Sequence, residues 1–288
     1  MAADASALIV VPARPWARFT GLLRRSFIAA YEDGCFGIAK GAAYSALLAF
    51  FPICTSIAAI LAQVRAESVS AQISRFLFEV VPPGSQELVR YVFSYHGARP
   101  IWLLIAASLL AVWAGTGVMM TLMEGFQAAY KLPTGRPFLQ QRLVAVVLVF
   151  SAALPVVGAS MLILFSRSFT RWLGVPAGAQ APGWLILSTE AINYLIAFAA
   201  ILLVTCLLYF FGPNRPMKMR DVWPGAVLAT VLWLPATGGF GWYVRHIANY
   251  NLLYGSVAAS IIFIVWMYML AVIALLGCEF NAERECQG

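Results

Sequence analysis

The chain has 288 residues, of which 62% are hydrophobic and only 11% are charged. Soluble domains carry about 25% charged residues, so this composition excludes a soluble globular protein and predicts an integral membrane protein. The net charge of +7 comes from Lys and Arg residues that lie between hydrophobic segments and form no continuous basic stripe. That pattern argues against a nucleic-acid-binding protein.

Residues 1–40 predict a cytoplasmic N-terminal segment that contains an amphipathic helix. Trp16, Phe19 and Phe27 recur at helical spacing beside Arg24 and Arg25. This arrangement suits a helix that lies on an anionic membrane surface. The first apolar run is short and has no basic residues before it, so we expect no cleavable signal peptide.

Six long uncharged stretches predict six membrane-spanning helices, since about 20 apolar residues in a helix cross a hydrocarbon core of about 30 Å. The fourth predicted span begins before Glu190 and contains it, because the apolar pattern continues on both sides. Together the spans form one transmembrane domain, 41–281, followed by a short cytoplasmic tail, 282–288. The predicted spans are about 41–64, 100–123, 143–166, 184–211, 222–244 and 257–278.

The segment between the first two spans, residues 65–99, is long and patterned. Two runs of apolar residues at helical spacing are separated by Pro82, Pro83 and Gly84. The pattern predicts two short amphipathic helices at the membrane interface. A cap that rests on the outer face of the bilayer is favoured over a mobile gate.

Helix breakers occur inside several predicted spans. Pro52, Pro155 and Pro235 lie in the first, third and fifth spans, and Gly238 and Gly239 follow in the fifth. Such residues often serve only to kink a helix or to allow close packing. The alternative is a set of broken helices around a cavity.

A weak internal similarity favours the second alternative. The run 114–117 in the second span resembles 236–239 in the fifth, and these two spans cross the membrane in opposite directions. Two halves of three helices in opposite orientation would form a 3+3 inverted repeat, which is common among secondary transporters.

The candidate substrate-binding or ion-binding site lies on the fourth span. Glu190, Asn193 and Tyr194 share one helix face, and Gly238 and Gly239 of the fifth span would let its backbone approach closely. A carboxylate in lipid is costly, so such groups usually face a bundle interior or water. The alternative is a glutamate near the end of the span that reaches interfacial water.

Charged and polar residues near the ends of the spans form two further candidate groups. A cytoplasmic ion network is expected among Glu124, Glu279, Arg136, Arg142, Arg215 and Arg220. An outer polar vestibule is expected at Arg245, His246, Asn249 and Asn251. A structural role is favoured for the first group, and simple solvation is the alternative for the second.

Catalytic motifs are absent from the sequence. It contains two histidines, no Walker A motif and no G-x-S-x-G elbow, and its five cysteines include no C-x-x-C pair. We therefore expect no enzyme activity, no metal site and no cofactor, and we interpret the cysteines as packing residues.

Several short motifs spread along the chain resemble the YihY/BrkB family of bacterial inner-membrane proteins. Two positions depart from the family pattern, since Gln127 replaces a usual Asn and Cys278 a usual Ala. The motifs are Ala43-Tyr44-Ser45 to Phe51-Pro52, Glu124-Gly125-Phe126-Gln127 to Tyr130, Arg136-Pro137-Phe138, Pro213-Asn214 to Asp221, Pro224-Gly225-Ala226, Tyr254-Gly255-Ser256, Trp266-Met267-Tyr268 and Leu276 to Asn281.

The resemblance implies a six-span protein of the inner membrane, with an old association with serum resistance or virulence and an old ribonuclease name. The expected function is transport or export of a small solute or lipid, without an ATPase of its own. A structural or envelope-assembly protein is the first alternative, and a membrane-associated ribonuclease is a disfavoured second. The expected partners are the lipid bilayer and the unknown cargo, with no nucleic acid, and a homo-oligomer is left open.

Twelve of the 19 Lys and Arg residues lie in the segments on one side of the predicted membrane, and seven lie in longer segments on the other. By the positive-inside rule, both termini should be cytoplasmic. Reporter fusions or cysteine labelling should therefore place residues near 14, 136, 218 and 284 inside, and residues near 75, 171 and 250 outside. Labelling of Arg136→Cys from outside intact cells would contradict this topology.

Overall fold

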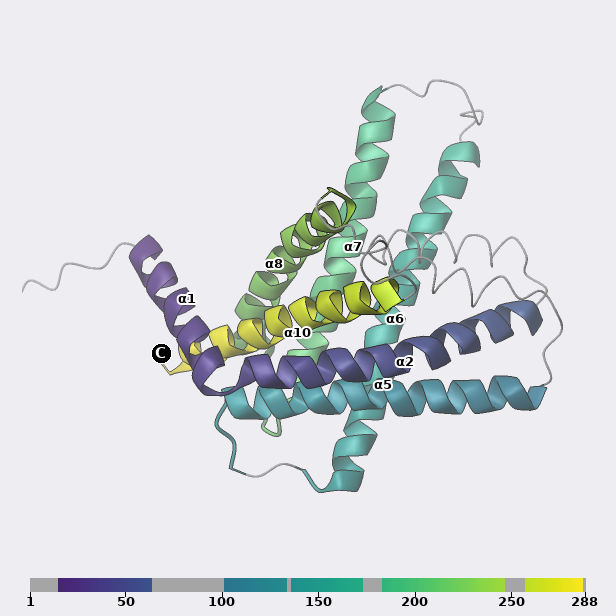
Figure 1. Ribbon diagram of the computed structural model, residues 1–288. Coiled ribbons are helices and arrows are strands. Elements are labelled where there is room, and N and C mark those ends of the chain that lie inside the picture. Colours follow the sequence, from purple (N-terminus) through teal and green to yellow (C-terminus); the bar gives the residue numbers. More distant parts are fainter. Residues whose placement is uncertain (1–14, 64–100, 134–135, 173–182, 247–256, 287–288) are drawn as a thin grey trace, which may run out of the picture.

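The computed structural model describes residues 15–63, 101–133, 136–172, 183–246 and 257–286, and every long element within them is an α-helix (Figure 1). The all-helical prediction is confirmed, because six of the seven helices are long and apolar enough to cross a membrane. The helices are α1 (Pro15–Glu32), α2 (Cys35–Gln63), α5 (Ile101–Ala129), α6 (Phe138–Trp172), α7 (Gly183–Phe211), α8 (Met219–His246) and α10 (Ala258–Glu285). The amphipathic helices predicted within 65–99 lie outside the described residues.

The helices extend beyond several of the predicted spans. α2 already begins at Cys35 and includes Lys40, and α5 continues through Glu124 to Ala129. The prediction ended most spans at a charge. A helix does not have to end there, because its backbone hydrogen bonds do not depend on side-chain polarity and long charged side chains can reach the interface.

Neighbouring helices along the chain pack against one another, and α10 also packs against α1, α2 and α5. Figure 1 shows α2, α5 and α10 side by side, with α6 and α7 forming a separate pair that crosses them. In the 18-residue apolar stretch that marks α10 as a candidate span, 39% is buried, against 11 to 28% in the corresponding stretches of the other spans. The last helix is therefore the most buried of the candidate spans.

Aromatic and hydroxyl contacts hold the neighbours of α10 in place. Phe19 of α1 packs against Phe280 with ring centroids 5.9 Å apart, and Phe50 of α2 packs against Phe263 at 4.7 Å. Between α2 and α5, the hydroxyl oxygens of Ser56 and Ser108 lie 2.8 Å apart and share a hydrogen bond.

We call the end of the bundle formed by the starts of α2, α6 and α8 and the ends of α5, α7 and α10 the basic end. Residues with a positive φ shape two of its turns. Gly34, with φ of 71°, lies between α1 and α2, and Lys131, with φ of 51°, follows α5. The N–H groups of Lys131 and Leu132 donate to the carbonyls of Ala128 and Gln127, which closes α5 in a Schellman motif.

Helices make backbone-level contact at the basic end. A Cβ on Gly225 of α8 would overlap the carbonyl oxygen of Gly277 of α10, and a Cβ on Gly277 would lie 2.7 Å from the carbonyl oxygen of Gly225. A Cβ on Gly125 of α5 would likewise overlap Leu275 of α10. Small residues permit such close approach between helices in a membrane, where packing and hydrogen bonding replace the hydrophobic effect.

Toward the opposite end some helix faces are open, although Thr237 and Phe240 of α8 still contact α10 there. A Cβ added to Gly158 of α6, or to Gly238 or Gly239 of α8, would meet no atom of the described residues within 4 Å. Leu154 of α6 and Tyr194 of α7 are 72% and 75% exposed. Apolar side chains exposed in this way suit a helix face that contacts lipid.

This contrast predicts opposite effects of one substitution at two glycines. Gly277→Ala should destabilise the protein by about 1–3 kcal/mol, because overpacking forces the α8–α10 contact apart. Gly238→Ala should be neutral or stabilise by up to about 1 kcal/mol, because space is available and alanine favours the helix. Thermal unfolding in detergent measures both, and equal effects would contradict the packing described here.

Candidate functional site

The amide of Asn281 joins α10 to the start of α8 at the basic end. Asn281 is buried; its Oδ1 accepts a hydrogen bond from the N–H of Gly225 at 2.7 Å, and its Nδ2 donates to the carbonyl of Val222 at 2.9 Å. One side chain therefore satisfies a buried donor and a buried acceptor on the neighbouring helix, which is possible only because the helices touch at Gly225 and Gly277.

Tyr209 brings α7 to the same place. Its ring is fully buried and lies edge-on to Phe126 of α5, with centroids 5.4 Å apart. Its hydroxyl donates to the carbonyl oxygen of Ala274 of α10 at 2.5 Å. Three helices are thus connected through one side chain.

Arg136 precedes α6 and binds the end of α7. Its guanidinium donates to the carbonyl oxygens of Phe211 at 3.4 Å, Gly212 at 3.2 Å and Pro213 at 3.2 Å. The last carbonyls of a helix have no partners within the helix and carry a partial negative charge, so a cation there is favourable. Burial lowers the pKa of the Arg136 guanidinium, yet arginine stays charged at neutral pH.

Arg142 connects α6 with α5. Its guanidinium carbon lies 3.7 Å from the centroid of the Trp113 ring, a cation–π contact. The same group donates to the carbonyl of Trp113 at 3.2 Å and to the sulfur of Met120 at 3.2 Å.

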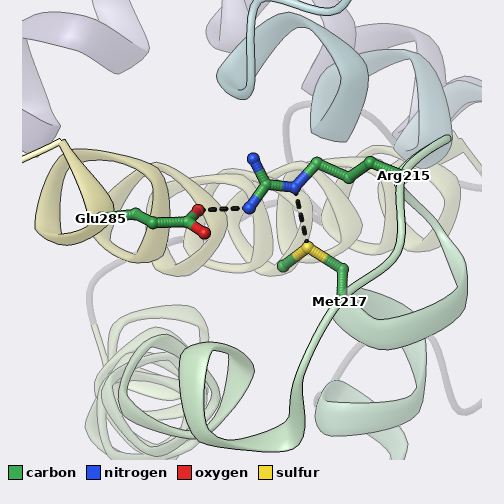
Figure 2. Close-up of polar contacts among 3 residues, drawn as sticks. All are labelled: Arg215, Met217 and Glu285. Carbon is green, nitrogen blue, oxygen red and sulfur yellow. Dashed lines mark hydrogen bonds and ion pairs between the residues drawn. The ribbon is translucent and has the colours of Figure 1, made fainter.

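Arg215 lies between α7 and α8 and forms an ion pair with Glu285 near the end of α10, while its Nε donates to the sulfur of Met217 at 3.0 Å (Figure 2). The guanidinium also covers the ring of Tyr130, 4.2 Å from its centroid. Burial raises the pKa of the Tyr130 phenol, so its hydroxyl keeps its proton.

Glu279 is 1% exposed and has a different partner from the one predicted. Its Oε1 accepts a hydrogen bond from the thiol of Cys35, at the start of α2, at 3.3 Å. Among the described residues it forms no salt bridge.

The predicted ion network stays a prediction, and several of its members have other partners within the described residues. Arg136, Arg142 and Arg215 contact carbonyl oxygens, rings or sulfur atoms. The ion pair within the described residues joins Arg215 to Glu285, which the prediction did not include. Glu124 is exposed. The sequence placed these charges in one membrane layer, but the direction of each side chain depends on how its helix is rotated in the bundle.

The predicted site on the fourth span lies at an exposed helix face. Glu190 is the first residue of the candidate span Glu190–Phe211 and is exposed, as is Tyr194, while Asn193 is half-buried. Gly238 and Gly239 are also exposed. A polar cavity at this face stays a prediction.

The described members of the predicted outer vestibule contact their own helix. Arg245 donates to the carbonyl of Gly241 at 3.1 Å, and the ring of His246 stacks on Trp242 with centroids 5.5 Å apart. Asn249 and Asn251 lie outside the described residues, so the vestibule stays a prediction.

A cavity of about 350 Å³ opens at the basic end between the start of α8 and the end of α10. Its lining consists of Lys218, Arg220, Asp221, Asn281, Arg284 and Glu285. Within the described ranges, no three His, Cys, Asp or Glu side chains form a group that could hold a metal ion. The cavity is therefore lined by groups that bind anions and by carboxylates, and it adjoins the Asn281 bridge.

Comparison with known proteins identifies the family. The profile of a family described as "Virulence factor BrkB" matches residues 27–287. The chain belongs to the BrkB/YihY (UPF0761) membrane protein family. The family resemblance predicted from the sequence is confirmed, and the chain is a multi-pass membrane protein.

The relatives are similar over different shares of their lengths. The chain is 31% identical to the "Putative ribonuclease-like protein YfkH" of Bacillus subtilis, over 62% of this chain and 65% of that protein. It is 28% identical to a "UPF0761 membrane protein" of Alkalilimnicola ehrlichii, over 87% of this chain and 55% of the relative. A relative from Pseudoalteromonas atlantica is 25% identical, over 94% of this chain and 89% of the relative. No solved structure matches.

Most of the motif segments that carry the family resemblance meet at the basic end. Gly225 and Asn281 come from two of them, Arg136 binds the carbonyl of Pro213 from two others, and Phe126 packs on Tyr209. Sequence reasoning missed Tyr209 and Glu285, for which the sequence carries no signal. Asn281 could have been found, since it lies one helical turn after Gly277.

Asn281→Ala should destabilise the protein by about 1–3 kcal/mol, because the buried N–H of Gly225 would lose its partner outside the helix. Asn214→Ala is the matched control, since Asn214 lies exposed at the same end and should be neutral. Thermal unfolding of the purified chain in detergent compares them. An Asn281→Ala variant as stable as the control would show that the Asn281 bridge does not stabilise the protein.

Proposed function

We propose that this protein moves a small solute or lipid across the membrane without ATP hydrolysis of its own, and that the cargo is a lipid-like amphiphile. The observation that carries the proposal is the contrast between the two ends of the bundle. Gly225 and Gly277 lock α8 to α10 at the basic end, whereas Gly238 and Gly239 of the same helix α8 have no neighbours within 4 Å of an added Cβ.

Such a contrast supports motion of the opposite end about a fixed basic end. Pro155 of α6 and Pro235 of α8 each remove one hydrogen bond from their helix, and Gly158, Gly238 and Gly239 follow within a turn. Prolines and glycines in membrane helices allow kinks and hinges. Rocking of helices around a fixed region is a common way to give alternating access to the two sides of a membrane.

The exposed apolar faces of α6 and α7 favour an amphiphilic cargo. The exposed faces of α6 and α7 are lined by apolar side chains such as Leu154, Val157, Tyr194 and Leu195. A charged solute would need a polar route, whereas a lipid could keep its chains against these faces while its headgroup crosses beside the helices.

The chain spans 65% of the length of the first relative and 55% of the length of the second. Any activity of those longer proteins is therefore only a proposal for this chain. We further propose location in a bacterial inner membrane with both described ends cytoplasmic, supported by the twelve-to-seven distribution of basic residues.

Lipid movement can be measured with the purified chain in vesicles that contain a fluorescent phospholipid. Dithionite destroys only fluorophores in the outer leaflet, so a protein that moves lipid should increase the destroyed fraction without added ATP. The double variant Gly238→Ala/Gly239→Ala should slow this movement about 5- to 30-fold, because it favours the straight helix by about 1–2 kcal/mol.

Gly37→Ala is the control, since Gly37 lies in α2 and also has free space around an added Cβ. It should leave the rate unchanged. Glu190→Gln, measured in parallel for flux of cations and of small anions as well as lipid, tests the predicted site on α7. If the wild-type chain moves neither lipid nor solute, the transport proposal fails and a structural or envelope-assembly role takes its place.

A further inference from the structure

The cavity between α8 and α10 is lined by three cationic side chains and two carboxylates. Each carboxylate already has a favourable electrostatic partner outside this set of cations. Glu285 is paired with Arg215 (Figure 2), and Asp221 lies in the first turn of α8, where the helix dipole favours an anion.

The three cations of the lining are not engaged in this way. Lys218, Arg220 and Arg284 form no salt bridge with any residue that the structure describes. Lys218 and Arg220 flank the start of α8, and Arg284 lies on the last turn of α10. Cations gathered in one concave site repel one another, and an anion bound between them relieves that repulsion.

The ring of Tyr130 lies under the guanidinium of Arg215, the partner of Glu285. Its hydroxyl oxygen is buried and has no hydrogen-bond partner among the described residues. Buried polar groups without partners are rare, and each calls for an explanation.

An apolar strip continues from the cavity along α8. Met219, Trp223, Val231 and Leu234 are exposed and lie on one side of the helix. Tryptophan is enriched where the headgroup layer meets the hydrocarbon core. A phosphate in the cavity would therefore have room for acyl chains beside it, which distinguishes a lipid from a free anion.

We propose that this cavity binds the phosphate of an anionic phospholipid, with Lys218, Arg220 and Arg284 as its ligands and the acyl chains along the exposed strip of α8. The inference goes beyond the proposed function, because such a lipid can bind at this site whether or not anything crosses the membrane. Binding and flux are therefore measured separately, and the failure of one does not decide the other.

Native mass spectrometry of the purified full chain in neutral detergent can count bound phosphatidylglycerol and phosphatidylcholine. The wild type should prefer phosphatidylglycerol, and the triple variant Lys218→Gln/Arg220→Gln/Arg284→Gln should bind it at least about tenfold more weakly. The control Arg25→Gln/Lys40→Gln/Arg245→Gln removes the same charge from exposed residues outside the cavity and should keep the preference.

Three results would overturn the assignment. These are no preference in the wild type, equal losses in both triple variants, or inorganic phosphate that displaces the lipid at equal concentration, which would indicate a site for free phosphate. Cooperative thermal unfolding of both variants confirms that they are folded. If the triple variant is unfolded, Arg284→Gln alone replaces it, with Arg245→Gln as its control, and binding unchanged in both would equally reject the site.

Discussion

The close contact between α8 and α10 at Gly225 and Gly277 is the constraint on which the rest of the structure depends. Within a membrane, apolar side chains gain little by leaving lipid for one another, so helices associate through close packing and hydrogen bonds. Two glycines remove the side chains that would hold the backbones apart. The amide of Asn281 can then reach Gly225 and Val222, and the hydroxyl of Tyr209 can reach Ala274.

The same contact explains why polar groups gather at one end of the bundle. Arg136 holds the carbonyl end of α7, Arg215 holds Glu285, and the Cys35 thiol donates to the buried Glu279. Each of these contacts joins segments that are distant in sequence. The basic end is therefore joined by polar contacts between distant segments, an arrangement in which polar groups are satisfied by protein and not by lipid.

The asymmetry between the ends connects fold with proposed function. The helix α8 is in backbone contact with α10 at Gly225, whereas its face at Gly238 and Gly239 is open among the described residues. The cavity beside the locked half carries the surplus positive charge. The proposed headgroup site at the basic end and the exposed apolar faces farther along the helices would suit a protein that binds and moves lipids.

The sequence by itself determined the membrane class, the six spans and the family, because long uncharged stretches and local motifs are properties of consecutive residues. Even the polar character of the basic end followed from where Lys and Arg occur. The partners of Glu279 and Arg215, the role of Tyr209 and the cavity beside Asn281 were decided only by the tertiary structure. These depend on how each helix is rotated about its axis and how closely it approaches its neighbours, and in a uniformly apolar span hydrophobic periodicity carries little information about rotation.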